Sequence, residues 1–151
     1  MKLPIGLAFL LLVSSRTVTA APPIPRTILV LYDTTYDKET AFLPVHQIAE
    51  MPLNHLGLIV TFVDINAGLP PLSEMRGVRG ILTWFQSDAM KDPQGFLEWA
   101  ESVIDAGMKF VVVGDLSVHR DFQNRLTPFH LVNRFWAKLG LKSENDWNAI
   151  T

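Results

Sequence analysis

The chain has 151 residues, 48% of them hydrophobic and 19% charged, which is room for one domain with a sizeable core. Its 13 basic and 15 acidic residues give a formal charge of -2. This balance, without any run of Lys or Arg, argues against a nucleic-acid-binding surface, and the absence of cysteine excludes disulfides, cysteine-based metal sites and a cysteine nucleophile.

The start of the chain has the pattern of a secretory signal peptide over residues 1–20. A basic Met1-Lys2 pair precedes an apolar stretch over 3–13, and small side chains lead up to Ala20. About 11 apolar residues are too few for a membrane anchor, which needs roughly 20. We therefore expect export to the bacterial periplasm or exterior, with cleavage after Ala20 or Ala21 and no stable membrane span afterwards.

After this segment, a Pro-rich leader over 21–26 precedes one predicted domain over 27–141, and the tail over 142–151 has no fold signal. Unbroken apolar runs predict strands buried on both faces, over 27–32, 58–64, 80–85 and 109–114. Apolar residues at helical spacing predict helices over 40–56, 92–107 and 127–140. Pro52 is expected to kink or divide the first of these helices.

Strands that alternate with helices predict right-handed βαβ units and a parallel sheet covered on both faces. The expected fold is α/β: a three-layer, flavodoxin-like or amidotransferase-like sandwich with a four-stranded parallel sheet in the order 2-1-3-4. Because the chain ends soon after its last helix, a truncated domain is an alternative to a complete one.

In such a sheet the binding crevice lies outside the carboxyl ends of the strands. The polar and aromatic residues expected at this edge are Asp33, Thr34, Thr35, Asp64, Trp84, Phe85, Gln86, Asp115, Ser117 and His119. The loop over 33–40 lacks glycine and is rich in acids, which disfavours a flavin phosphate, and no G-x-G-x-x-G follows any strand. The four histidines show no local zinc spacing. We therefore expect no cofactor and no metal.

Two catalytic arrangements are weak alternatives. Ser117 and His119 follow the fourth strand, but the second glycine of a G-x-S-x-G elbow is missing, so a polar turn is the other interpretation. Asp33 and Asp64 follow neighbouring strands and would meet as a general acid-base pair, or each would cap its own loop.

A ligand platform is a further expectation at the same edge. Trp84 and Phe85 would offer aromatic faces for a sugar or peptide, with Tyr36 opposite and Asp115 beside them. For Trp84, core packing is an equal alternative. Trp99 and Trp136 lie on helical faces and are expected in the core.

Four segments together resemble a known type of domain. They are ILVLYDTTYD (28–37), PLNHLGLIVTFVDINAGLP (52–70), GVRGILTWFQSD (77–88) and GMKFVVVGD (107–115). With the signal peptide, they resemble exported class I glutamine-amidotransferase-like domains of bacterial polysaccharide-modifying proteins of the Pel exopolysaccharide hydrolase/deacetylase type. The resemblance implies a fold and a setting and transfers no active residue, because the amidotransferase cysteine is absent.

We therefore expect an exported, non-catalytic module that serves as an interaction or scaffolding part of an envelope polysaccharide-processing protein. Its expected partners are an exopolysaccharide or a polysaccharide-modifying enzyme domain. The alternative is a secreted hydrolase that acts on carbohydrate through the crevice carboxylates or through Ser117 with His119.

Overall fold

The computed structural model describes residues 23–142. The expected signal peptide over 1–20 lies outside the described residues, as does nearly all of the expected tail over 142–151. Within residues 23–142, no helix combines the length and the hydropathy that crossing a bilayer requires.

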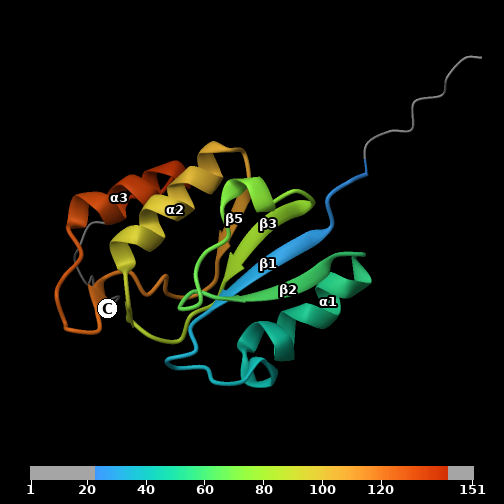
Figure 1. Ribbon diagram of the computed structural model, residues 1–151, viewed down its shortest axis with the longest axis horizontal. Coiled ribbons are helices and arrows are strands. Elements are labelled where there is room, and N and C mark those ends of the chain that lie inside the picture. The colour runs from blue at the N-terminus through green and yellow to red at the C-terminus, as the bar shows by residue number, and fades with distance from the viewer. Residues whose placement is uncertain (1–22, 143–151) are drawn as a thin grey trace, which may run out of the picture.

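The main sheet has four parallel strands, which confirms the predicted mixed α/β fold with a parallel sheet. They are β1 (Thr27–Tyr32), β2 (Ile59–Asp64), β3 (Val78–Thr83) and β5 (Lys109–Val112). Their order is β2-β1-β3-β5 (Figure 1). The fourth strand of the main sheet is labelled β5 because a two-residue strand, β4 (Ala89–Met90), comes before it in the chain. The sequence did not predict β4, which pairs in parallel with β6 (Arg120–Asp121).

The two central strands, β1 and β3, are buried on both faces, which explains their unbroken apolar runs. Leu29 and Leu31 of β1 belong to the large core cluster, while Val30 between them belongs to a smaller cluster on the opposite face. Helices α2 (Pro93–Asp105) and α3 (Phe129–Lys138) cover the first face, and α1 (Glu50–His55) covers the second (Figure 1). The layout is consistent with a flavodoxin-like fold.

The predicted helix over 40–56 is irregular. It consists of a 3-10 turn η1 (Thr40–Phe42), a π-helical turn η2 (Val45–Ala49) and then α1. Pro52 is the third residue of α1, and the change from π-helical to α-helical geometry occurs within the turn that precedes it.

The other two helices lie within their predicted spans, and α3 begins at Phe129, two residues after the predicted start. The Asp92 side chain accepts a hydrogen bond from the Gly95 N–H at 3.0 Å and caps α2, and Pro93 is its first residue. Gly107 follows the helix with a positive φ of 86°, a conformation that glycine adopts without strain. A 3-10 turn, η3 (Leu72–Glu74), lies where a short turn was predicted.

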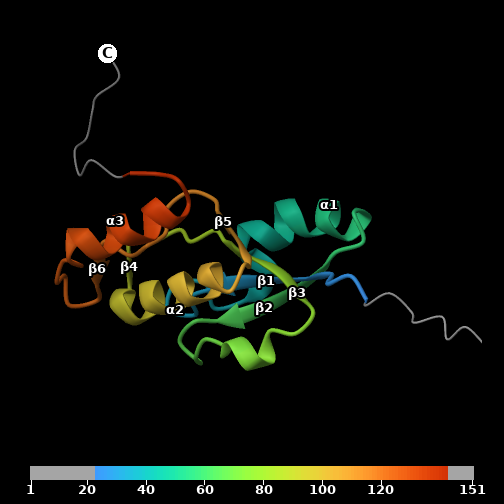
Figure 2. The same cartoon turned by 90° about the horizontal axis from the view of Figure 1, so that it is seen from above.

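The small β4–β6 sheet lies beyond the carboxyl end of the main sheet. Figure 2 shows the two strands beside the first turns of α2 and α3. The loop that follows β3 and the loop that follows β5 are therefore joined by backbone pairing, which orders the edge of the sheet where a binding crevice is expected.

Candidate functional site

The strand order places a reversal point next to β1. The chain passes from β1 to β2 on one side of β1, and then continues with β3 on the other side. In open α/β sheets, ligands bind at such a point, outside the carboxyl ends of the strands. The loops after β1, β2 and β3 are therefore the first place to look for a site.

A polar network joins the ends of β1 and β2. The Asn66 side-chain amide donates to Asp33 Oδ1 at 2.7 Å, and its backbone N–H donates to Asp64 Oδ1 at 3.0 Å. Thr34 donates from its hydroxyl to Asp64 Oδ2 at 2.8 Å, and the Thr35 N–H donates to Asp33 Oδ1 at 2.8 Å. The structure thus brings the two predicted carboxylates into one network, with Asn66 between them.

The two carboxylates differ in their surroundings. Burial would raise the pKa of Asp64, but the hydrogen bonds from Asn66 and Thr34 together outweigh it, so the pKa is lowered and the group is ionised at neutral pH. Asp33 is only 3% exposed. Among the described residues, three buried side-chain oxygens have no hydrogen-bond partner: Asp33 Oδ2, Thr83 Oγ1 and Thr127 Oγ1. Unpaired buried oxygens of this kind lower stability.

A third carboxylate lies close to this network. Burial, and in second place the negative charge of Asp33, raise the pKa of Asp37. The backbone explains their proximity, because the Asp37 N–H donates to the Asp33 carbonyl oxygen at 2.9 Å. The loop after β1 therefore concentrates negative charge, which supports the expectation that this loop does not hold a phosphate.

A cleft of about 390 Å³ opens next to the network. One wall is the loop after β2 and the other is the start of α2 with β4. Its lining combines polar side chains with apolar and aromatic ones: Ile65, Asn66, Gly68, Leu69, Met90, Lys91, Asp92, Gly95, Phe96 and Trp99. Asn66 belongs to both the cleft and the carboxylate network, so the two features form one site.

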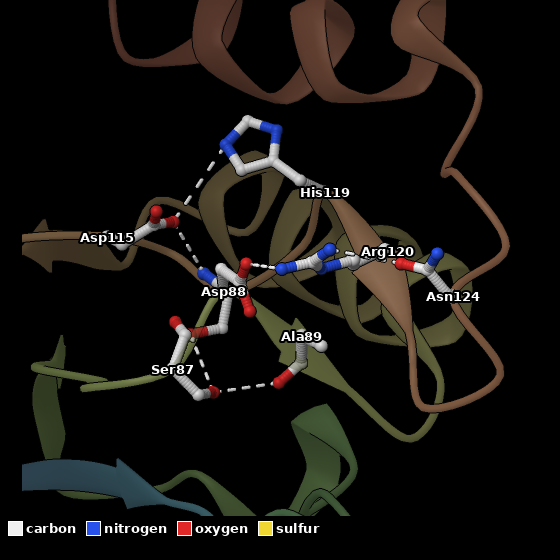
Figure 3. A network of polar contacts seen from close by, with 8 residues as sticks. Ser87, Asp88, Ala89, Asp115, His119, Arg120 and Asn124 are labelled. Carbon is white, nitrogen blue, oxygen red and sulfur yellow. Dashed lines mark hydrogen bonds and ion pairs between the residues drawn. The ribbon is translucent and has the colours of Figure 1, made fainter.

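Ser117 and His119 do not form a catalytic pair in this structure. Ser117 is 1% exposed and its hydroxyl donates to the backbone carbonyl of Ser87. The His119 ring turns toward Asp115, with 3.9 Å between Nε2 and Oδ1, and in Figure 3 it lies above the loop while Ser87 lies below it. Ser117 has a positive φ of 61°, and its N–H donates to Asp115 Oδ1 at 2.8 Å. These contacts describe a polar turn rather than a nucleophile beside its base.

The same turn is fastened to the loop after β3. Arg120 pairs with Asp88 and donates to Asn124 Oδ1 at 3.0 Å (Figure 3). The Ser87 hydroxyl donates to the Ala89 carbonyl at 2.8 Å. The two loops are thus held by side chains as well as by the β4–β6 pairing, which gives Asp88 and Arg120 a structural role.

The predicted aromatic platform is not assembled. Phe85 is 4% exposed and packs edge-on against Phe96 with ring centroids 6.0 Å apart, so it presents no ring face to a ligand. Trp84 packs with the small core cluster on the opposite face of the sheet. Tyr36 is exposed, but its ring contacts Phe122 at a centroid distance of 6.0 Å. Alternation along the chain explains the split, because neighbouring residues point to opposite faces.

Sequence reasoning missed Asn66, and its placement of Trp99 in the core is confirmed in part, because Trp99 packs against the large core cluster. Asn66 is the residue that joins both carboxylates, and its signal was its position directly after an apolar strand that ends in Asp64. Trp99 is half-buried at the cleft rather than wholly in the core, and its indole N–H donates to the Pro70 carbonyl at 2.8 Å. Among residues 23–142 no group of three or more His, Asp or Glu side chains has a metal-binding arrangement.

Comparison of the chain with protein-family models, with curated proteins and with solved structures finds no match. Its function therefore has to be argued from the geometry of the site.

Proposed function

We propose that this chain is an exported, non-catalytic α/β module that binds carbohydrate in the cleft between residues 65–69 and the start of α2. In this proposal it is the recognition part of an envelope polysaccharide-processing protein. The setting comes from the signal-peptide pattern and from the resemblance of four segments to amidotransferase-like domains of that type.

The observation that carries the proposal is the lining of the cleft. Sugars are bound by polar groups that exchange hydrogen bonds with hydroxyls and by aromatic faces that pack against C–H groups. The cleft provides opposite charges at Lys91 and Asp92 and the half-buried indole of Trp99. Asn66 also lines it, while its side-chain N–H groups are held by Asp33. Lys91 and Asp92 are exposed and accessible to a ligand.

Two further observations support a binding role without catalysis. The Ser117 hydroxyl is buried and committed to the Ser87 carbonyl, so it has no base to activate it. The hydrogen bonds to Asp64 lower its pKa, which makes this carboxyl group a poor general acid and also a weak general base at neutral pH. Asp64 therefore acts in the proposal as an anchor that orients Asn66 at the cleft.

The test is isothermal titration of the purified chain with oligomers of N-acetylglucosamine and of glucosamine, chosen because the resemblance is to proteins that deacetylate polysaccharides. We expect Lys91→Ala to weaken binding at least fivefold. Lys109→Ala is the matched control, since it removes the same charge from another exposed lysine, on β5 and outside the cleft.

Loss of affinity in the Lys91 variant alone would support the cleft as the binding site. Equal affinity of both variants, or no heat of binding to either oligomer by the unaltered chain, would reject the proposal.

A further inference from the structure

The two edges of the main sheet differ in how they are protected against pairing with another strand. β5 has four residues and begins with an exposed lysine, Lys109, which is a common way to discourage pairing at an edge. β2 has six residues, and from Ile59 to Val63 it contains no charge and no proline. Its register with β1 is regular, without a bulge. β2 therefore lacks the usual protection of an edge strand.

The backbone of β2 has hydrogen-bonding groups that face outward. The N–H groups of Ile59 and Ile65 donate toward the β1 side, to the carbonyls of Arg26 and Tyr32. Because successive residues of a strand direct their backbone groups to opposite sides, the N–H and C=O groups of Val60 and Phe62 point away from β1. These groups form an open template for another strand.

The helical layer beside this edge also exposes apolar side chains. Four large ones, from η1 to the C-cap of α1, are between 60% and 77% exposed: Phe42, Ile48, Met51 and Leu56. Ile59 at the start of β2 is 58% exposed, and alternation along the strand places it on the face of the sheet opposite α1. Figure 1 shows α1 and β2 together on the side of the molecule that faces away from α2 and α3. Ile48 and Met51 are three residues apart in a helical segment and therefore lie on one face, and neighbouring exposed apolar side chains of this kind are typical of a protein interaction surface.

The charges of this surface suit a second copy of the chain. Glu50 is the only acidic residue from Thr40 to Val63, and it is paired with His46 at 2.5 Å within its own copy. The chain as a whole is acidic, with a formal charge of -2, so this is a region where two copies can approach with little repulsion. A twofold contact brings a surface against itself and requires this kind of self-complementarity.

We propose that two copies of this chain associate through antiparallel pairing of β2 with β2 and through contact between the outer faces of their α1 helices. A register centred on Thr61 places Val60 opposite Phe62 of the second copy, so that the outward backbone groups of both residues are paired. In this register Asp64 faces Leu58, and no two carboxylates meet. The result is a continuous eight-stranded sheet across the dimer.

The test is sedimentation equilibrium of the purified chain from about 1 to 100 µM, the range in which moderately stable dimers dissociate. We expect a dimer, and Ile59→Lys or Met51→Lys is expected to raise its dissociation constant at least tenfold. Val111→Lys on β5 is the matched control, because Val111 is a β-branched residue of the opposite edge strand and is 51% exposed. Circular dichroism checks that each variant is folded.

Hydrogen exchange adds a readout that locates the contact. The amides of Val60 and Phe62 should gain protection as concentration rises, while those on β5 should not. A monomer at 100 µM would overturn the proposal, and so would a dimer that dissociates equally with Val111→Lys or that survives both Ile59→Lys and Met51→Lys.

Discussion

The hydrogen bonds to Asp64 lead to a quantitative prediction for the variant Asp64→Asn. The carboxylate accepts from the Thr34 hydroxyl at 2.8 Å and the Asn66 N–H at 3.0 Å, while a third bond, from the Thr34 N–H, is longer at 3.3 Å. A hydrogen bond to a charged group is worth about 1.5–3 kcal/mol and a neutral one about 0.5–1.5 kcal/mol, so each short bond loses about 1 kcal/mol when the charge is removed. Asp64 is half-buried, and solvent screening reduces the total to about 1.5 kcal/mol.

The sign of the pH dependence follows from the lowered pKa of Asp64. A carboxyl group whose pKa is lower in the folded state stabilises the protein above its unfolded pKa, about 3.9. That stabilisation is lost as the pH falls through the folded pKa. The deficit of Asp64→Asn should therefore be complete at pH 7, begin to shrink near pH 4 and vanish at lower pH.

Urea denaturation of the unaltered chain and of Asp64→Asn, at pH 7 and at a series of lower pH values, measures this difference. A deficit of about 1.5 kcal/mol at pH 7 that closes below about pH 4 is the expected result. The reasoning would be refuted by a deficit that does not change with pH, because the loss would then come from packing rather than from the charge.

Three more changes test other parts of the structure. Asp37→Asn should raise the free energy of unfolding at pH 7 but not below about pH 4. The pKa of Asp37 is raised in the folded protein, so the stability that its protonated form gives is present below the unfolded pKa and is lost as the pH rises through the folded pKa. A urea series that shows no gain in stability at pH 7 would contradict this. Ser117→Ala leaves the Ser87 carbonyl without its side-chain donor and should lower stability by about 1–2 kcal/mol in urea, whereas unchanged stability would mean that this hydrogen bond contributes nothing. Phe135→Ala removes a completely buried ring that packs against Phe110 and should lower stability by about 4 kcal/mol, and a loss under 2 kcal/mol would show that the core closes around the gap.

The strands of the main sheet could be predicted closely from the sequence. β1 begins and ends where its apolar run does, and β2 differs from its predicted span by one residue. The run predicted over 80–85 is displaced, because β3 covers Val78–Thr83 and Phe85 instead makes an isolated bridge with Asp115. Apolar runs report burial on both faces, but they do not show where strand pairing stops.

The candidate site was only half predictable. Asp33 and Asp64 were expected at neighbouring strand ends, and the parallel register of β1 and β2 brings them there. Asn66, which joins them, had only its position two residues after Asp64 as a signal, and the place of Trp99 at the cleft had none. The aromatic platform failed because adjacent residues of an extended chain, such as Trp84 and Phe85, turn to opposite faces.

The sequence by itself determined the class of fold and the edge of the sheet where polar side chains gather. Both follow from local periodicity, because alternating strands and helices of this length can bury their apolar faces in few ways. Only the tertiary structure decided which polar groups of different loops meet: Ser117 with the Ser87 carbonyl, and Asn66 with Asp33. These contacts depend on loop paths between residues about thirty positions apart, and no local pattern encodes such distances.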